Sequence, residues 1–493
     1  MTSNKFPYPD RLSYLWLAIG FVLALFSTGK LAIPLFAWLS SIFLLRFMRT
    51  QKRGLVGYLL IALSLAAAMA IAWRGMIAVP PPGSAVVIVS GALMGGIPFI
   101  ADRFLSPHLK GLWATLVFPL ISTGLEFLSM GSGSPMGSFG ASGYSQYGNS
   151  VLLQLLSVTG MWGLSFLMNW TASIVNWAWE QRFEWPSIRH GLALYGGIMA
   201  LVLAYGGARL TFARIEPGTV RVASFTEVST DLPALMNTLR SGRVAFGQAT
   251  RDIHARYFER TATEARAGAK IILWPEVAGI GVEEDETALM EQGREVAKRE
   301  GIYLAIPFLT IYQDDKRPHE NKLIVFDPAG SQAMEHVKYG GNMFEGSKLG
   351  DGILRTTETP YGTLSGVICW DTDFINRIAQ SGRNGTDILL SPAHDWREIN
   401  PVHGQMSAFR AIENGVTVIR HADLGLSVVT DPYGRTLAAM DHHATADRTM
   451  VAQVPTHGVR TIYSTIGDLF GWLSAGGFVA VAIWSVIRRR RGL

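Results

Sequence analysis

The first 212 residues contain seven long apolar runs, and an eighth lies just before the C-terminus. Most of these runs are close to the roughly 20 residues that a helix needs to cross about 30 Å of hydrocarbon. Soluble proteins do not repeat apolar helices of this length, so the sequence predicts a polytopic α-helical membrane domain. The runs are 12–26, 31–47, 55–73, 85–100, 112–130, 151–179, 192–212 and 466–487.

Basic residues gather in short clusters beside these runs, and nearly all of them fall on one side when the runs are counted as spans. Cytoplasmic loops retain lysine and arginine during membrane insertion, so both termini are predicted to be cytoplasmic. Lys30 and Arg74 are the exceptions. This pattern also explains the formal charge of +5 without a nucleic-acid partner, which we do not expect. The cytoplasmic residues are Lys5, Arg11, Arg46, Arg49, Lys52, Arg53, Arg103, Lys110, Arg182, Arg189 and 488–491.

Between the seventh and eighth runs the sequence alternates strand-like and helix-like segments, which predicts an α/β domain outside the cytoplasm. Turn signals at 327–330 and 431–434 favour hairpins and therefore a mixed sheet. The expected domains are 1–215 with seven transmembrane helices, 216–460 as the extramembrane domain, and 461–493 with the eighth helix and a basic tail. The predicted strands are 220–225, 270–274, 303–309, 322–326, 362–369, 388–391, 416–420 and 426–430, and the predicted helices are 241–267, 286–300 and 404–414.

Three residues of this domain follow apolar or hairpin segments, where side chains can be presented for chemistry. Cys369 is the only cysteine, which excludes an internal disulfide, and it is either a small buried side chain or a nucleophile. Glu276 ends the segment Leu-Trp-Pro-Glu and could equally supply charge to a helix N-terminus. Lys338 could be an ordinary solvated lysine. Each residue alone leaves its role open.

In the order Glu276, Lys338, Cys369, these residues resemble the catalytic set of carbon-nitrogen hydrolases of the nitrilase superfamily. The resemblance covers most of 220–455. A nitrilase-like domain placed between seven apolar runs and an eighth resembles the apolipoprotein N-acyltransferase family. Further similarities are the segments 369–374, 385–391 and 431–435, Ser134-Pro135-Met136-Gly137, His394-Asp395-Trp396, Gln405, Glu413, Thr461, Tyr463, Gly467 and Asp468.

The resemblance implies an α-β-β-α sandwich in which Cys369 is the nucleophile, Glu276 the general base, and Lys338 the positive charge beside them. It also implies a second glutamate that supports the lysine, for which Glu345 is the best match. Glu335 is the rival for that second glutamate, and Lys348 is the alternative lysine. Neither a cofactor nor a metal is expected. The spacing of His394, His403, His421, His442, His443 and His457 fits no closed set of metal ligands.

The implied reaction moves an acyl chain from a membrane phospholipid, through a cysteine thioester, to the N-terminal amine of a lipid-modified apolipoprotein. The implied location is a bacterial inner membrane, with the catalytic domain on the periplasmic side. The alternatives are a membrane-tethered amidase, an N-acyltransferase acting on a different amine, or an inactive scaffold that binds lipoproteins.

Two segments carry open alternatives. Residues 339–346 depart from the family pattern, and with Met343 and Phe344 they are either a lipid-contacting gate or a plain surface turn. The Gly/Ser-rich segment 131–149 is either a flexible linker or a loop beside the active site. Glu126 lies near the outer end of the fifth run. It is either a functional residue or a side chain that extends to the membrane–water interface.

Overall fold

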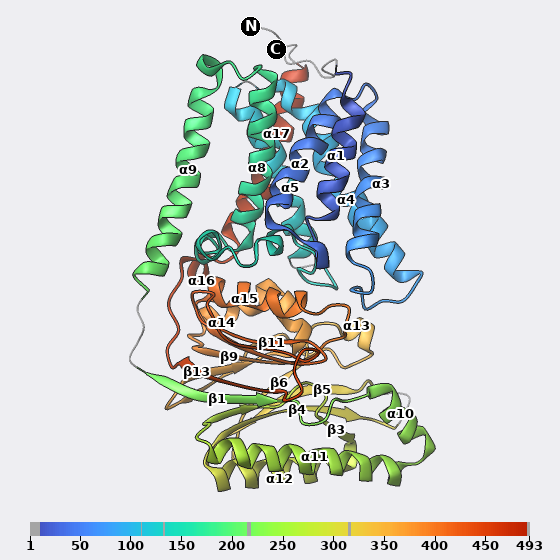
Figure 1. The fold of residues 1–493 in the computed structure, drawn as a ribbon, viewed down its shortest axis with the longest axis vertical. Helices are drawn as coiled ribbons and strands as arrows, with labels where there is room; N and C mark the ends of the chain where they lie inside the picture. The colour runs from blue at the N-terminus through green and yellow to red at the C-terminus, as the bar shows by residue number, and fades with distance from the viewer. Residues whose placement is uncertain (1–9, 110, 132–133, 214–217, 314–316, 491–493) are drawn as a thin grey trace. The chain divides into compact units, whose positions relative to one another are not determined.

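Figure 1 shows the computed structural model, which describes residues 10–109, 111–131, 134–213, 218–313 and 317–490. Contacts divide the chain into two compact units. One contains 1–134, 138–212 and 466–493, and the other contains 135–137 and 213–465. The predicted boundary at Glu216 lies outside the described residues, as do Lys5, Lys110 and Arg491.

The first unit is helical, and a helix lies over each of the eight predicted apolar runs. Within the described residues, five helices are long and apolar enough to span a membrane: 54–72, 83–108, 111–130, 185–211 and 469–487. The chain is thus a multi-pass membrane protein. The helices of this unit are α1 (Ser13–Leu25), α2 (Pro34–Thr50), α3 (Gly54–Ala72), α4 (Gly83–Leu105), α5 (Val117–Met130), α6 (Ser150–Leu153), α7 (Leu156–Thr159), α8 (Met161–Glu180), α9 (Trp185–Thr211) and α17 (Leu469–Arg490).

Three predicted spans differ from simple straight helices. The run 151–179 is a pair of helical segments bent by 118°. The bend falls at Gly160, whose φ of +61° is a conformation that glycine adopts without steric cost. Helices α1 and α2 have only 13 and 17 residues. The total of eight spans stays a prediction.

Three helices of the membrane unit are joined by a buried ion network. Arg49 of α2 donates to both carboxylate oxygens of Asp102 of α4, at 2.8 and 2.9 Å. It also donates to Glu180 of α8 at 2.9 Å. The three side chains are at most 4% exposed. Arg49, whose predicted role was only as a topology signal, thus also links helices together.

We expect Asp102→Ala to destabilise the membrane unit by about 3–5 kcal/mol, because it leaves the Arg49 charge buried with one partner fewer. Thermal unfolding of the detergent-purified protein measures this change. Glu284→Ala is the control, since Glu284 and its partner Arg243 are about half exposed and such pairs contribute at most about 1 kcal/mol. Equal effects of the two substitutions would contradict the expectation.

Two residues of segment 131–149, Ser142 and Gln146, are held by polar contacts within the membrane unit. Glu126 accepts a hydrogen bond from the backbone N–H of Ser142 at 2.6 Å. Gln146 accepts from the indole of Trp38 at 2.9 Å and donates to the carbonyl of Pro34 at 2.9 Å. The flexible-linker interpretation is therefore wrong for these residues, and Glu126 has a structural partner.

The second unit contains two mixed β-sheets. One has the strand order β13-β1-β2-β4-β5-β6, with β3 also paired to β4, and the other has the order β12-β11-β10-β9-β8-β7. The strands are β1 (Thr219–Phe225), β2 (Ile271–Leu273), β3 (Gly279–Val282), β4 (Tyr303–Ile311), β5 (Glu320–Phe326), β6 (Gln332–Val337), β7 (Thr356–Thr359), β8 (Gly362–Gly366), β9 (Ile388–His394), β10 (Thr417–Asp423), β11 (Leu426–Thr430), β12 (Thr436–Asp441) and β13 (Thr449–Pro455).

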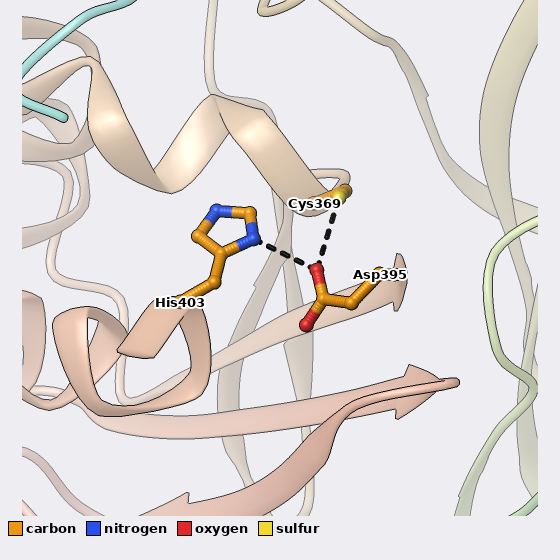
Figure 2. A group of neighbouring side chains, drawn as sticks. All are labelled: Cys369, Asp395 and His403. Carbon is orange, nitrogen blue, oxygen red and sulfur yellow. Dashed lines mark hydrogen bonds and ion pairs between the residues drawn. The ribbon is translucent and has the colours of Figure 1, made fainter. Parts of the chain in front are cut away.

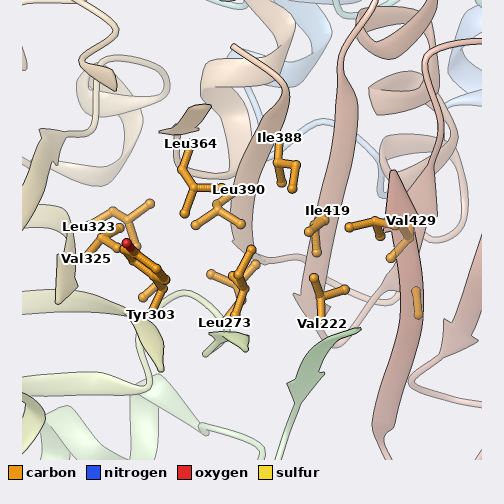
Figure 3. Close-up of a cluster of buried hydrophobic side chains, with 14 of the residues drawn as sticks. Val222, Leu273, Tyr303, Leu323, Val325, Leu364, Ile388, Leu390, Ile419 and Val429 are labelled. Atoms are coloured by element: carbon orange, nitrogen blue, oxygen red, sulfur yellow. The ribbon is translucent and has the colours of Figure 1, made fainter. Parts of the chain in front are cut away.

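The two sheets pack face to face, and helices cover their outer faces, as the implied α-β-β-α sandwich requires (Figure 1). The core between the sheets is apolar, with Leu273 and Leu323 from one sheet and Leu390 and Ile419 from the other (Figure 3). Such central strands are buried on both faces, which explains their continuous apolar sequences. The helices of this unit are α10 (Leu232–Ser241), α11 (Arg243–Arg266), α12 (Glu283–Glu300), α13 (Asn342–Glu345), α14 (Ile375–Arg383), α15 (Val402–Asn414) and α16 (Ile462–Ile466).

Candidate active site

The candidate residues follow the ends of strands from both sheets. Glu276 lies three residues after β2, and Lys338 follows β6 directly. Cys369 was predicted to end a strand, but β8 ends at Gly366 and Cys369 begins a 3-10 turn, residues 369–373. Its φ of +48° is rare for a residue with a side chain, and Val277, directly after Glu276, has a φ of +71°. Backbone strain of this kind concentrates at functional sites.

Lys338 joins the two candidate glutamates. Its ammonium donates to Glu276 Oε1 at 2.8 Å and to Glu345 Oε1 at 2.6 Å. Lys338 and Glu276 are buried, whereas the Glu345 side chain is 35% exposed. The structure therefore brings together three of the four residues proposed from the sequence by direct contacts.

The two alternatives lie elsewhere. The Lys348 ammonium is on the surface, where it pairs with Glu320 at 2.6 Å. Glu335 accepts from Gln332 at 2.9 Å in an exposed position. Neither side chain is bonded to the Lys338 cluster.

The charge states of the cluster follow from burial and pairing. Burial alone would raise the pKa of Glu276, but the charge of Lys338 and hydrogen bonds from Lys338 and Asn321 lower it overall. Burial raises the pKa of Glu345 more than its pairing with Lys338 lowers it. The pKa of Lys338 is raised despite its burial, because both carboxylates stabilise the ammonium. Glu276 is thus an ionised base beside a permanent positive charge.

The fourth candidate, Cys369, is buried and influenced by the same charges. Burial, together with the negative charges of Glu276 and Asp395, raises the pKa of its thiol well above the ordinary range, while Lys338 and Arg420 oppose that rise. The sulfur lies 3.9 Å from the carbonyl oxygen of His394 and 4.0 Å from Asp395 Oδ1. The resting cysteine is therefore a thiol, and a base must remove its proton before attack.

Asp371 holds the turn that carries Cys369 against the segment that follows Lys338. Its Oδ2 accepts from the backbone N–H of Ile368 at 2.8 Å and contacts His336 Nε2 at 2.7 Å. Its Oδ1 accepts from the N–H groups of Tyr339 and Gly340 at 2.8 and 2.6 Å. Sequence reasoning noted Asp371 only as part of the segment 369–374 that resembles the family, and missed this role.

Two further contacts orient Glu276. Asn321 donates its side-chain N–H to Glu276 Oε1 at 2.7 Å, and the backbone N–H of His394 donates to Oε2 at 2.8 Å. Sequence reasoning missed Asn321, because nothing near position 321 distinguishes it from any strand asparagine. His394 belonged to a motif that had been noted, although the contact uses its backbone.

The glycine pair after Lys338 has a steric reason. A Cβ at Gly340 would lie 2.8 Å from the Trp370 backbone, and one at Gly341 would lie 2.6 Å from the Trp370 ring and 2.9 Å from Glu345 Oε1. Phe344 stacks on Trp370, with ring centroids 5.5 Å apart, so it packs on the domain. Met343 is 77% exposed and is the one residue of the pair that remains available for a gate.

We expect Gly341→Ala to slow thioester formation by about tenfold or more, because the new methyl group displaces Glu345 or Trp370. Gly346→Ala is a matched control: its φ of +68° resembles the +80° of Gly341, but its Cβ would meet nothing within 4 Å. Single-turnover acylation of both variants is the measurement. Equal slowing would assign the effect to the backbone conformation alone.

Cys369, Asp395 and His403 form the one group of possible metal ligands found among the described residues, with ligand atoms within 4.8 Å of one another (Figure 2). The guanidinium of Arg420 already supplies a positive charge to these side chains. Arg420 Nη2 lies 2.8 Å from Asp395 Oδ1 and 2.9 Å from His403 Nδ1. The guanidinium takes the charge-neutralising role that a metal would have, so these residues do not fit a metal site.

Comparison with known proteins shows which families this chain is similar to. Residues 243–463 match the family described as carbon-nitrogen hydrolase, and residues 19–174 match the apolipoprotein N-acyltransferase N-terminal domain. Apolipoprotein N-acyltransferases from Geobacter metallireducens and Rhodopseudomonas palustris are 23% and 25% identical to this chain, covering 77% and 73% of it and 76% and 70% of the relatives. An amidase structure from Nesterenkonia sp. is 18% identical, with a TM-score of 0.40, over 49% of this chain and 93% of that one.

The sandwich fold and the carbon-nitrogen hydrolase match define the class of the second unit, which is a nitrilase-type domain. The membrane unit carries a second, separate match, to the apolipoprotein N-acyltransferase N-terminal domain. The chain belongs to the apolipoprotein N-acyltransferase family.

Proposed function

We propose that this chain is an acyltransferase that moves a fatty acyl chain from a membrane phospholipid to the N-terminal amine of a lipid-modified apolipoprotein. Glu276, Lys338 and Cys369 are proposed as the catalytic residues, and Glu345 as the second glutamate. The observation that carries this proposal is the buried Lys338 ammonium, which is bonded to both glutamates and opposes the rise in the pKa of the Cys369 thiol that burial causes.

In the first half-reaction Cys369 Sγ attacks the carbonyl carbon of a phospholipid ester. The C–S bond forms, the C–O bond breaks, and Glu276 passes the thiol proton to the departing alkoxide. The products are a thioester and a lysophospholipid. Two N–H groups of the Lys338 ammonium donate to the glutamates. The third is proposed to donate to the oxyanion of the tetrahedral intermediate.

In the second half-reaction the acceptor amine attacks the thioester carbonyl. The C–N bond forms, the C–S bond breaks, and a proton passes from the amine through Glu276 to the sulfur, which regenerates the thiol. Both substrates are lipid-anchored, so a catalytic domain tethered to the membrane meets them at a raised effective concentration. This supports a function for the membrane unit beyond anchoring.

A mass measurement tests this function. Purified protein mixed with phospholipid micelles of one acyl composition is expected to gain the mass of one acyl chain, and Cys369→Ala is expected to gain none. Adding a diacylglyceryl-cysteine peptide should discharge the adduct and acylate the peptide. Hydrolysis of a small amide without any phospholipid-derived adduct would instead assign the chain to the membrane-tethered amidases.

We further propose that the protein lies in the bacterial inner membrane, with residues 216–460 as a periplasmic catalytic domain and both termini in the cytoplasm. The distribution of lysine and arginine supports this orientation. A reporter enzyme that is active only in the periplasm, fused after residue 216, is expected to be active. Activity of a cytoplasm-dependent reporter at the same position would refute the topology.

A further inference from the structure

A second group of buried charges contacts the sulfur of Cys369 and has no part in the mechanism above. Asp395 Oδ1 lies 4.0 Å from the sulfur. One nitrogen of Arg420 donates to both oxygens of Asp395, at 2.8 and 2.9 Å, and His403 Nδ1 lies 2.8 Å from Asp395 Oδ1. Asp395, Arg420 and His403 are each at most 3% exposed. Figure 2 shows Asp395 between Cys369 and His403.

The fold places these residues on three different elements around the cysteine. Asp395 follows β9, Arg420 lies on β10 beside it, and His403 lies on α15. A buried carboxylate so close to a sulfur would oppose formation of the thiolate. A permanently charged guanidinium paired with that carboxylate offsets this effect, because arginine does not lose its proton in proteins.

We propose that the Asp395–Arg420 ion pair, with His403 as its third member, sets how readily Cys369 loses its proton. This inference rests on the proposed role of Cys369 as the nucleophile. Asp395 holds the resting cysteine in the thiol form, and Arg420 keeps the thiolate accessible when Glu276 removes the proton. Arg420 acts on the sulfur through its own charge and also pairs with Asp395, whereas His403 acts through Asp395 and is a positioning residue.

The charged groups that act on the sulfur are Glu276, Lys338, Asp395 and Arg420. Glu276 and Asp395 raise the pKa of the thiol, and Lys338 and Arg420 lower it. Removing either charge of the Asp395–Arg420 pair should therefore shift the pKa of the thiol in a predictable direction. Loss of the Asp395 charge should favour the thiolate, and loss of the Arg420 charge should disfavour it.

Because Cys369 is the only cysteine, iodoacetamide alkylation followed by intact mass reports its thiolate fraction alone. At one pH below the thiol midpoint, we expect the full-length protein with Asp395→Asn to be alkylated about tenfold faster than the unmodified protein. Arg420→Gln is expected to be about tenfold slower, and the double variant to return close to the original rate. The readout needs no acyl transfer, so it is independent of the proposed substrates.

Changes of the same direction in the two single variants would overturn the proposal, as would an Asp395→Asn rate that is unchanged or slower. Unfolding would raise the alkylation rate of any variant and remove its thermal transition, so it is recognised separately. If Arg420→Gln does not fold, the alkylation rate of Asp395→Asn alone tests the proposal. If neither single variant folds, the double variant decides: removing both opposite charges should leave its alkylation rate within about threefold of the original.

Discussion

Cys369→Ser is expected to lower acyl transfer by at least about 10³-fold, with no thioester detectable by mass. The serine hydroxyl is a poorer nucleophile than the thiol and is not activated by the charges that act on the sulfur. The substitution replaces the sulfur with a smaller oxygen atom and adds no volume, so the domain should remain folded. Normal acyl transfer by this variant would exclude Cys369 as the nucleophile.

Glu276→Gln tests whether Glu276 is the base that removes the thiol proton in this step. The glutamine side chain has one acceptor oxygen, so it keeps the hydrogen bond from Asn321 or the one from the His394 backbone but not both, and it cannot take the thiol proton. The expected loss is about 10²–10⁴-fold in thioester formation. A loss confined to the second half-reaction would assign the first proton transfer to another group.

Lys338→Ala is expected to lower thioester formation by about 10²–10³-fold, because the site loses its oxyanion donor and the positive charge that favours the thiolate. Lys348→Ala is the matched control, since Lys348 lies on the surface and is bonded to Glu320. Single-turnover acylation compares the two. If Lys348→Ala lost activity and Lys338→Ala retained it, the lysine assignment would be wrong.

The Lys338 substitution also has a structural cost that must be separated from catalysis. It leaves Glu276 and Glu345 together without their cation, and removing one partner of a buried ion pair costs about 3–5 kcal/mol. A thermal unfolding scan measures this cost. Lys338→Arg keeps a positive charge, so a folded but slow Lys338→Arg variant would show that the geometry of the ammonium matters beyond its charge.

The elements most visible in the sequence were those with a single strong physical signal. The apolar runs of the membrane unit became helices, although the run 151–179 is broken at Gly160. The strands β1, β4 and β5 were visible as short segments rich in apolar residues. Helix α14 and the exposed strands β7 and β12 were not predicted, because a short or half-exposed element has too weak a pattern.

The sequence by itself determined the class of this protein and four candidate residues, because hydrophobic length, charge distribution and residue order are local properties of the chain. Only the tertiary structure decided which lysine meets Glu276 and Glu345, since 62 residues separate Lys338 from Glu276. It also placed Asp371 and Asp395 at the cysteine turn. Their contacts join strands distant in sequence, and no local pattern encodes which buried charges will meet.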